Sequence, residues 1–125
     1  MAPGRLRQLS PAELETLLRR VDRADVQGPA LSADDERAAV KHYLAVLADR
    51  HPGRSVEVRI PPYAAVQCIV GTRHTRGTPP AVVETDATTW LRLARGTLAF
   101  DAAVREGSVR ASGERSNLSP LLPLT

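Results

Sequence analysis

The chain has 125 residues, of which 42% are hydrophobic and 25% charged, with a net charge of +3 and one cysteine. This length suits a single domain with a real core, and one cysteine excludes an internal disulfide. No apolar run approaches the roughly 18 residues of a membrane span and no secretory leader pattern is present, so we expect a cytoplasmic protein without a membrane segment.

The excess of positive charge is local. Residues 54–76 contain four arginines against one glutamate, and this local excess equals the excess of the whole chain. Nucleic-acid-binding proteins usually carry a dense Lys/Arg face with interleaved aromatic residues, whereas this chain has a single lysine and 3% aromatic residues. We therefore predict no nucleic-acid partner and favour a small anionic ligand near this segment.

A helix is predicted over residues 11–24. Ser10 and Glu13 form a capping box around a proline at the first helical position, which is a specific start signal. Its apolar stripe consists of Leu14, Leu17, Leu18 and Val21. Such a stripe needs a covering surface, and its own domain, a second copy of the chain or a cavity beneath it as a lid would each serve. We expect residues 1–9 to form a loose tail.

A second helix is predicted from the cap at Ser32 to about residue 50, because its first turn is acidic and its apolar stripe is wide enough for a core position. His42 and His51 have no cysteine or carboxylate at ligand spacing, so we interpret both as surface histidines and predict no metal site.

We expect the chain to divide into an N-terminal helical extension over 1–31 and one compact unit over 32–125.

Two strands are predicted next. Residues 55–60 alternate apolar and charged side chains, and the two prolines that follow end the strand because proline donates no ladder hydrogen bond. Residues 64–71 form a second strand that we expect to be buried on both faces except at Gln67, and to pair with the first. Cys68 lies within this apolar run and is interpreted as an inert core thiol.

The following loop, residues 72–80, carries a concentrated set of polar side chains that includes Arg73, His74, Arg76 and Thr78. Guanidinium, imidazole and hydroxyl groups beside a glycine suit a carboxylate or a phosphate. The loop is not a Walker phosphate loop, because it lacks the lysine and leads into a strand. A solvated hairpin loop and a ligand-facing loop both fit this composition.

Residues 81–113 have the clearest order of elements. A strand over 81–85 is followed by a helix that begins after the N-cap Asp86 and ends at Gly96. A shorter amphipathic turn and a strand over 107–112 complete this unit. The last eight residues of the chain contain four leucines, which predicts that the C-terminal segment packs on the domain.

This order resembles the second half of a sterol carrier protein domain, in particular that of its small stand-alone bacterial orthologues. The likeness runs through VVETDATTWLRLARGTLAFDAAVREGSVRASG and extends back through VEVRIPPYAAVQCIVGTRHTRGTPPAVVETD, so it covers roughly the last three quarters of the chain. The pattern contains no catalytic signature. The resemblance implies an apolar cavity for a lipid or a similar ligand, with a C-terminal segment that closes or lines it.

We predict a mixed α/β (α+β) fold similar to that of sterol carrier protein, with a mainly antiparallel twisted sheet of about five strands and helices packed on one face. A cavity is expected between the sheet and the helices. Its predicted apolar lining is Tyr63, Trp90, Leu93, Phe100, Leu118, Leu121 and Leu122, and its predicted polar mouth is Arg59, Arg73, His74, Arg76 and Thr78. We assign no catalytic residue and no cofactor.

The leading functional hypothesis is non-catalytic binding or transfer of an apolar or amphipathic small molecule, such as a lipid, an acyl chain or a sterol-like compound. The principal alternative is an enzyme, or an enzyme-accessory domain, that handles a polar anionic metabolite through the loop from Arg73 to Thr78. Domains of the family that this chain resembles also accompany thiol-dependent isomerases and alkyl sulfatases. A third hypothesis is an interaction module that forms a homodimer through helix 11–24. Fold alone does not choose among them.

Overall fold

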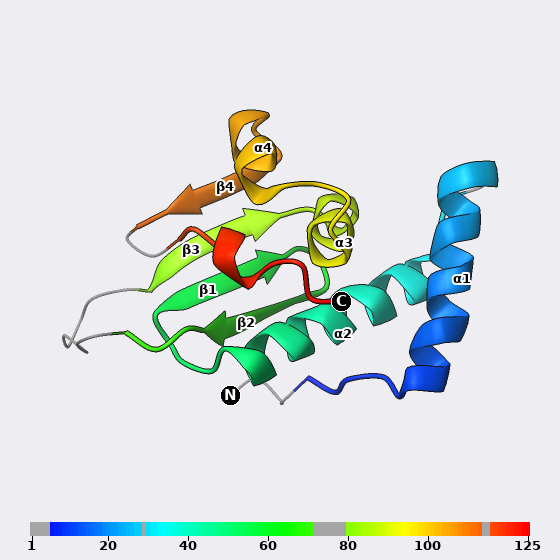
Figure 1. The fold of residues 1–125 in the computed structure, drawn as a ribbon, viewed down its shortest axis with the longest axis horizontal. Coiled ribbons are helices and arrows are strands. Elements are labelled where there is room, and N and C mark those ends of the chain that lie inside the picture. Colours follow the sequence, from blue (N-terminus) through cyan, green and yellow to red (C-terminus); the bar gives the residue numbers. More distant parts are fainter. Residues whose placement is uncertain (1–5, 29, 72–79, 114–115) are drawn as a thin grey trace.

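A computed structural model describes residues 6–28, 30–71, 80–113 and 116–125 (Figure 1). Its elements in chain order are α1 (Pro11–Gln27), α2 (Ala33–Arg50), β1 (Val56–Ile60), β2 (Ala64–Cys68), β3 (Ala81–Thr85), α3 (Ala87–Arg95), α4 (Phe100–Arg105), β4 (Val109–Ser112) and the 3-10 turn η1 (Ser119–Leu121). These confirm the predicted order of helices and strands. The helix predicted over 11–24 extends to Gln27, and the strand predicted over 107–112 begins at Val109.

The described strands form one four-stranded sheet in the order β2-β1-β3-β4 (Figure 1). β1 pairs antiparallel with β2 and parallel with β3, and β3 pairs antiparallel with β4. The sheet is therefore mixed and mostly antiparallel, which confirms the predicted α+β class. The described residues contain four strands, where the sequence indicated about five.

One face of the sheet is buried and the other is open. Val56, Val58 and Ile60, at alternate positions of β1, are fully buried. Arg59, between two of them in sequence, is exposed on the opposite face, where its register partner on β3 is Glu84. Because side chains alternate along a strand, this pattern gives the sheet one core face, on which the helices pack.

α2 is the central helix of the molecule. It contacts β2, α3 and α1, and the side chains from Ala39 to Leu47 are buried with the exception of Lys41. Trp90 of α3 is 1% exposed, and its indole N–H donates to the carbonyl of Val40 at 3.3 Å, which joins α3 to α2. The predicted core role of the second helix is confirmed.

The prediction for His42 was wrong. This side chain is buried, and its Nδ1 accepts a hydrogen bond from the backbone N–H of Leu9 at 2.9 Å. Leu6 and Leu9 also pack partly buried against the core, so the described end of the expected loose tail is held on the domain. His51, by contrast, is half-buried at the C-cap of α2.

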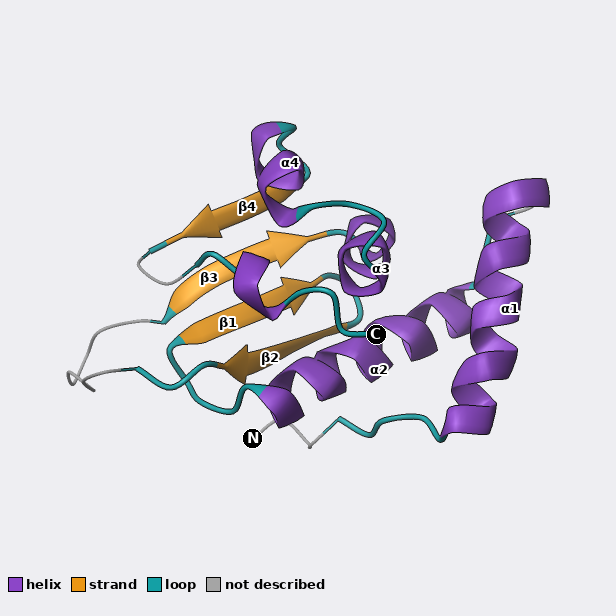
Figure 2. Cartoon of the chain, in the orientation of Figure 1, coloured by secondary structure: helices purple, strands orange, loops and turns teal. Residues whose placement is uncertain are grey.

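α1 starts at the predicted capping box, in which Ser10 and Glu13 each bond the backbone N–H of the other. Leu17 and Val21 from its apolar stripe are buried, and the helix contacts α2. Figure 2 shows α1 at the opposite end of the molecule from the strands. Its own domain therefore covers much of the stripe for which the sequence required a surface.

β2 ends at Cys68, earlier than predicted, because the backbone turns at Ile69, which has a φ of 66°. The Ile69 carbonyl accepts from both the N–H and the hydroxyl of Ser55, at 3.1 and 2.6 Å. A Cβ on Gly53 would lie 2.0 Å from that carbonyl oxygen, so this turn requires glycine there. The expected burial of this strand on both faces was also wrong, since Ala65 is exposed together with Gln67.

The C-terminal segment packs on the helices. Leu118 and Leu124 are buried, and the N–H of Leu124 donates to the carbonyl of Ala94 at 2.8 Å. Among the described residues, no helix combines the length and the apolar character that crossing a bilayer demands.

Candidate functional site

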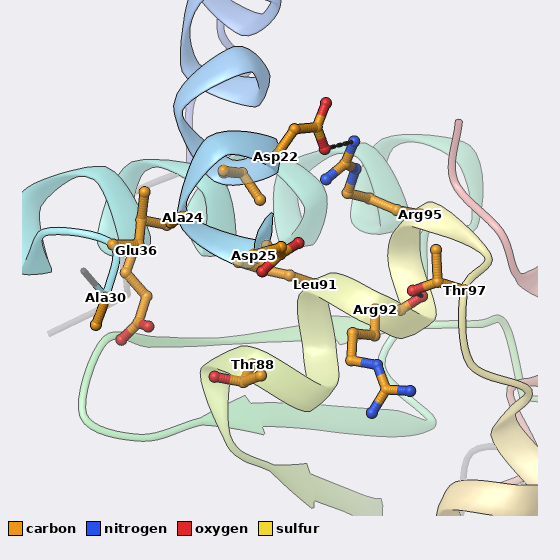
Figure 3. Close-up of a pocket in the computed structure, with 12 residues that line it drawn as sticks. Asp22, Ala24, Asp25, Ala30, Glu36, Thr88, Leu91, Arg92, Arg95 and Thr97 are labelled. Atoms are coloured by element: carbon orange, nitrogen blue, oxygen red, sulfur yellow. Dashed lines mark hydrogen bonds and ion pairs between the residues drawn. The ribbon is translucent and has the colours of Figure 1, made fainter. Parts of the chain in front are cut away.

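A pocket of about 520 Å³ lies between α1, the start of α2 and α3 (Figure 3). We call it the interhelical pocket. Its lining includes Val21, Asp22 and Asp25 from α1, and Leu91, Arg92 and Arg95 from α3. The volume falls within the range of about 300–1,000 Å³ that is usual for small-molecule sites. Apolar and charged side chains share its wall, which suits an amphipathic molecule.

Some of these charges already have partners. Arg95 binds Asp22 with 2.8 Å between Nη2 and Oδ1, and this ion pair ties α3 to α1 (Figure 3). Glu36, at the start of α2, accepts a hydrogen bond from the hydroxyl of Tyr63 at 2.7 Å. Neither of these acidic groups is therefore isolated.

Two charges of opposite sign in the same pocket lack such partners. Asp25 and Arg92 form no ion pair and no side-chain hydrogen bond with any residue that the structure describes. Figure 3 shows the Arg92 side chain reaching out on the side of Thr97, while Asp25 projects over Leu91. The lining of the pocket thus includes a carboxylate and a guanidinium without described partners, together with the apolar side chains of Val21 and Leu91.

Tyr43 of α2 places an unsatisfied polar atom near this pocket. Its side chain is 1% exposed, and its hydroxyl has no hydrogen-bond partner in the described structure. Burial raises the pKa of the phenol, and the charges of Arg95 and Asp22 act on it in opposite directions. Since buried polar atoms are nearly always paired, this hydroxyl is an exception among the described side chains.

A smaller pocket, of about 270 Å³, lies where α3 and α4 meet the C-terminal segment. We call it the C-terminal pocket, and its lining includes Leu93, Phe100, Ser119 and Leu122. The Ser119 hydroxyl donates to Asp101 of α4 at 3.0 Å, so the segment that borders the pocket is tied to a helix. The volume is slightly below the usual range for small-molecule sites.

A third pocket, of about 450 Å³, lies between α1, α2 and the segment that precedes α1. Its arginine, Arg20, is held by both carboxylate oxygens of Asp35, at 2.7 and 3.0 Å. Its Glu13 caps α1 through Ser10. Because these charges serve the structure, this pocket offers less to a ligand than the interhelical pocket does.

The predicted apolar lining is divided between the core and the C-terminal pocket. Leu93, Phe100 and Leu122 border that pocket together. Trp90 and Leu118 are buried in the core cluster and border none of the three pockets described above.

The two other predicted apolar residues are half-buried. Leu121 packs against the core next to Leu122. Tyr63 packs against the core as well, and its hydroxyl contacts Glu36 of the interhelical pocket.

The predicted polar mouth is only partly described. Arg59 lies on the open face of the sheet, where it pairs with Glu57 of its own strand, and this hydrogen bond raises the pKa of the guanidinium. The other members, Arg73, His74, Arg76 and Thr78, lie outside the described residues.

The charged residues of the interhelical pocket were missed at the level of sequence. Arg92 and Arg95 stand near the C-terminal end of a helix, where the helix dipole alone accounts for cations. Asp22 and Asp25 read as the polar face of an amphipathic helix. No local pattern indicates that α1 and α3 meet, because they are separated in the chain by α2 and three strands.

The single cysteine of the chain is a core residue. Cys68 is fully buried, and burial raises the pKa of its thiol to about 11, so the thiol stays protonated at neutral pH. The predicted burial of this thiol in the core is confirmed. Within the ranges that the structure covers, no group of three or more His, Cys, Asp or Glu side chains is arranged to hold a metal ion.

A family model described as "Bacterial SCP ortholog" matches residues 32–124. The match begins at Ser32, the cap of α2, and includes every described strand and every described helix except α1. No curated protein matches the chain. The interhelical pocket therefore joins residues of the matched region to residues of a helix outside it.

Proposed function

Because the chain belongs to the family of bacterial orthologues of sterol carrier protein, we propose that it binds an apolar or amphipathic small molecule, such as a lipid or an acyl chain, without catalysing a reaction. Transfer of that molecule between partners or surfaces follows from reversible binding. The protein works in the cytoplasm under this proposal.

One observation carries the proposal. Leu93, Phe100 and Leu122, which come from α3, α4 and the C-terminal segment, border a single pocket of about 270 Å³. Three apolar side chains from separate elements around one hollow favour an acyl chain or another hydrocarbon group.

The test compares two neighbouring leucines. Leu122→Phe fills part of the C-terminal pocket, whereas Leu121→Phe adds the same volume at a half-buried position that does not border it. We expect Leu122→Phe to weaken binding of a fluorescent fatty acid by about tenfold, a loss of about 1.4 kcal/mol. Leu121→Phe is expected to bind as the unchanged protein does.

The melting temperature of each variant serves as the control for folding. Equal affinities of both variants for the fatty acid would show that the C-terminal pocket does not hold it. Absence of binding by the unchanged protein, across acyl, sterol-like and lysolipid probes, would contradict the carrier function itself.

A further inference from the structure

α1 gives this chain a pocket that its matched region does not form alone. Val21, Asp22 and Asp25 belong to α1, which precedes the match at residue 32, and they face Leu91, Arg92 and Arg95 of α3 across the interhelical pocket. The Asp22–Arg95 ion pair and the burial of Val21 hold this wall in place. The pocket is thus a built feature of the whole chain.

The charges of the pocket select the kind of ligand. With Asp22 paired to Arg95 and Glu36 bonded to Tyr63, the groups left without a described partner are the carboxylate of Asp25 and the guanidinium of Arg92. A singly charged anion would bind Arg92 but lie in the field of the carboxylates. A singly charged cation would be attracted by Asp25 but repelled by the arginines. A ligand with one charge therefore complements only one of the two unpaired groups.

We propose that the interhelical pocket binds a zwitterionic headgroup, that is, a cationic amine or ammonium joined to a phosphate or carboxylate. Arg92 binds the anionic group by charge-assisted hydrogen bonds, and its planar fork can hold two oxygens at once. Asp25 faces the cationic group. Leu91 and Val21, both buried against the pocket wall, supply the apolar surface for the carbon atoms attached to the headgroup.

The same headgroup chemistry occurs in lipids and in free metabolites, and the probes separate these sources. Binding to the 125-residue chain is measured by calorimetry with dodecylphosphocholine below its micelle concentration, and with phosphocholine, which lacks the tail. On the same tail, dodecyl phosphate carries only negative charge, about −1.5 to −2 at pH 7, and dodecyltrimethylammonium carries only a positive charge. We expect dodecylphosphocholine to bind more tightly than either of these two probes. If phosphocholine binds as tightly as dodecylphosphocholine, the natural ligand is a free metabolite and not a lipid.

Two variants address the two charges separately. Arg92→Gln should weaken binding of dodecylphosphocholine by about tenfold without weakening binding of dodecyltrimethylammonium, because only the contact with the anionic group is lost. Asp25→Asn should weaken the binding of dodecylphosphocholine to a similar degree, without weakening the binding of dodecyl phosphate. Arg105→Gln and Asp49→Asn are matched controls, since both residues are exposed on helices and do not border this pocket.

The outcomes distinguish this inference from the proposed function, which concerns a different pocket. If both charge variants bind every probe as the unchanged protein does while Leu122→Phe reduces binding, the zwitterion site is wrong and the C-terminal pocket stands. If only the charge variants reduce binding, the zwitterion site stands and the ligand does not occupy the C-terminal pocket. Equal affinities for dodecyl phosphate and dodecylphosphocholine, unaffected by Asp25→Asn, would also overturn the inference.

Discussion

Tyr43 shows how one atom in the core affects stability. Its buried hydroxyl has no partner in the described structure, and such a group costs about 1–3 kcal/mol in desolvation. Tyr43→Phe should therefore raise the free energy of unfolding by about 1 kcal/mol, measured by urea denaturation at an unchanged m-value.

The matched control for Tyr43 is Tyr63→Phe. The Tyr63 hydroxyl donates to Glu36 at 2.7 Å, so its removal should lower the free energy of unfolding by about 0.5–1.5 kcal/mol. A loss of stability in Tyr43→Phe, comparable to that of the control, would mean that a buried water satisfies the Tyr43 hydroxyl.

Single residues differ in how far the sequence predicts their surroundings. Cys68 lies in an apolar strand, so local composition was enough to predict a buried, inert thiol. His42 was assigned to the surface because no cysteine or carboxylate lies at ligand spacing from it. Its burial depends on Leu9, a partner 33 residues away, and no local spacing encodes that contact.

At the scale of elements, the contact between α2 and the segment before α1 should respond to pH. Burial lowers the pKa of His42 below its usual value of 6.5, and the neutral ring accepts the hydrogen bond from Leu9. His42 therefore binds a proton more readily in the unfolded chain than in the folded protein. The contribution of His42 to the free energy of unfolding is therefore complete above about pH 6.5. It is lost as the pH falls from that value through the lower pKa that His42 has in the folded protein.

The measurement is the melting temperature between pH 7.5 and pH 5, for the unchanged protein and for His42→Asn. Asparagine keeps an acceptor near the position of Nδ1 but does not titrate in this range. We expect the unchanged protein to lose more stability than the variant as the pH falls. Parallel pH profiles would show that folding does not lower the pKa of His42, and they would contradict this prediction.

Elements were predicted best where a local signal defines their ends. The caps at Ser10, Ser32 and Asp86 fixed the starts of three helices. The end of β2 was not predicted, because the turn at Ile69 depends on hydrogen bonds to Ser55, on the far side of a hairpin. The parallel pairing of β1 with β3 also lay beyond local pattern, since it joins strands that are not consecutive.

At the scale of the whole molecule, α1 should contribute to global stability although it lies outside the matched region. Val21 is 5% exposed, whereas Val26 on the same helix is 82% exposed. Val21→Ser should lower the free energy of unfolding by about 2 kcal/mol, from lost burial and a buried hydroxyl. Val26→Ser is expected to change the free energy of unfolding by no more than about 0.5 kcal/mol.

Both variants should unfold in a single transition if α1 and the matched region form one cooperative unit. A second, earlier transition in Val21→Ser would show instead that α1 separates from the domain on its own. Unchanged stability of this variant would mean that α1 contributes nothing to the folded state, and the wall of the interhelical pocket would then lack the support inferred for it.

Trp90 gives the molecule a built-in optical probe. It is the only tryptophan of the chain, and its indole is enclosed between α3 and α2 with its N–H bonded to Val40. Its fluorescence should therefore be emitted at short wavelength, resist quenching by acrylamide and shift to the red when the two helices part. Because Trp90 borders neither the interhelical nor the C-terminal pocket, this emission reports unfolding and stays nearly constant when a ligand fills either one.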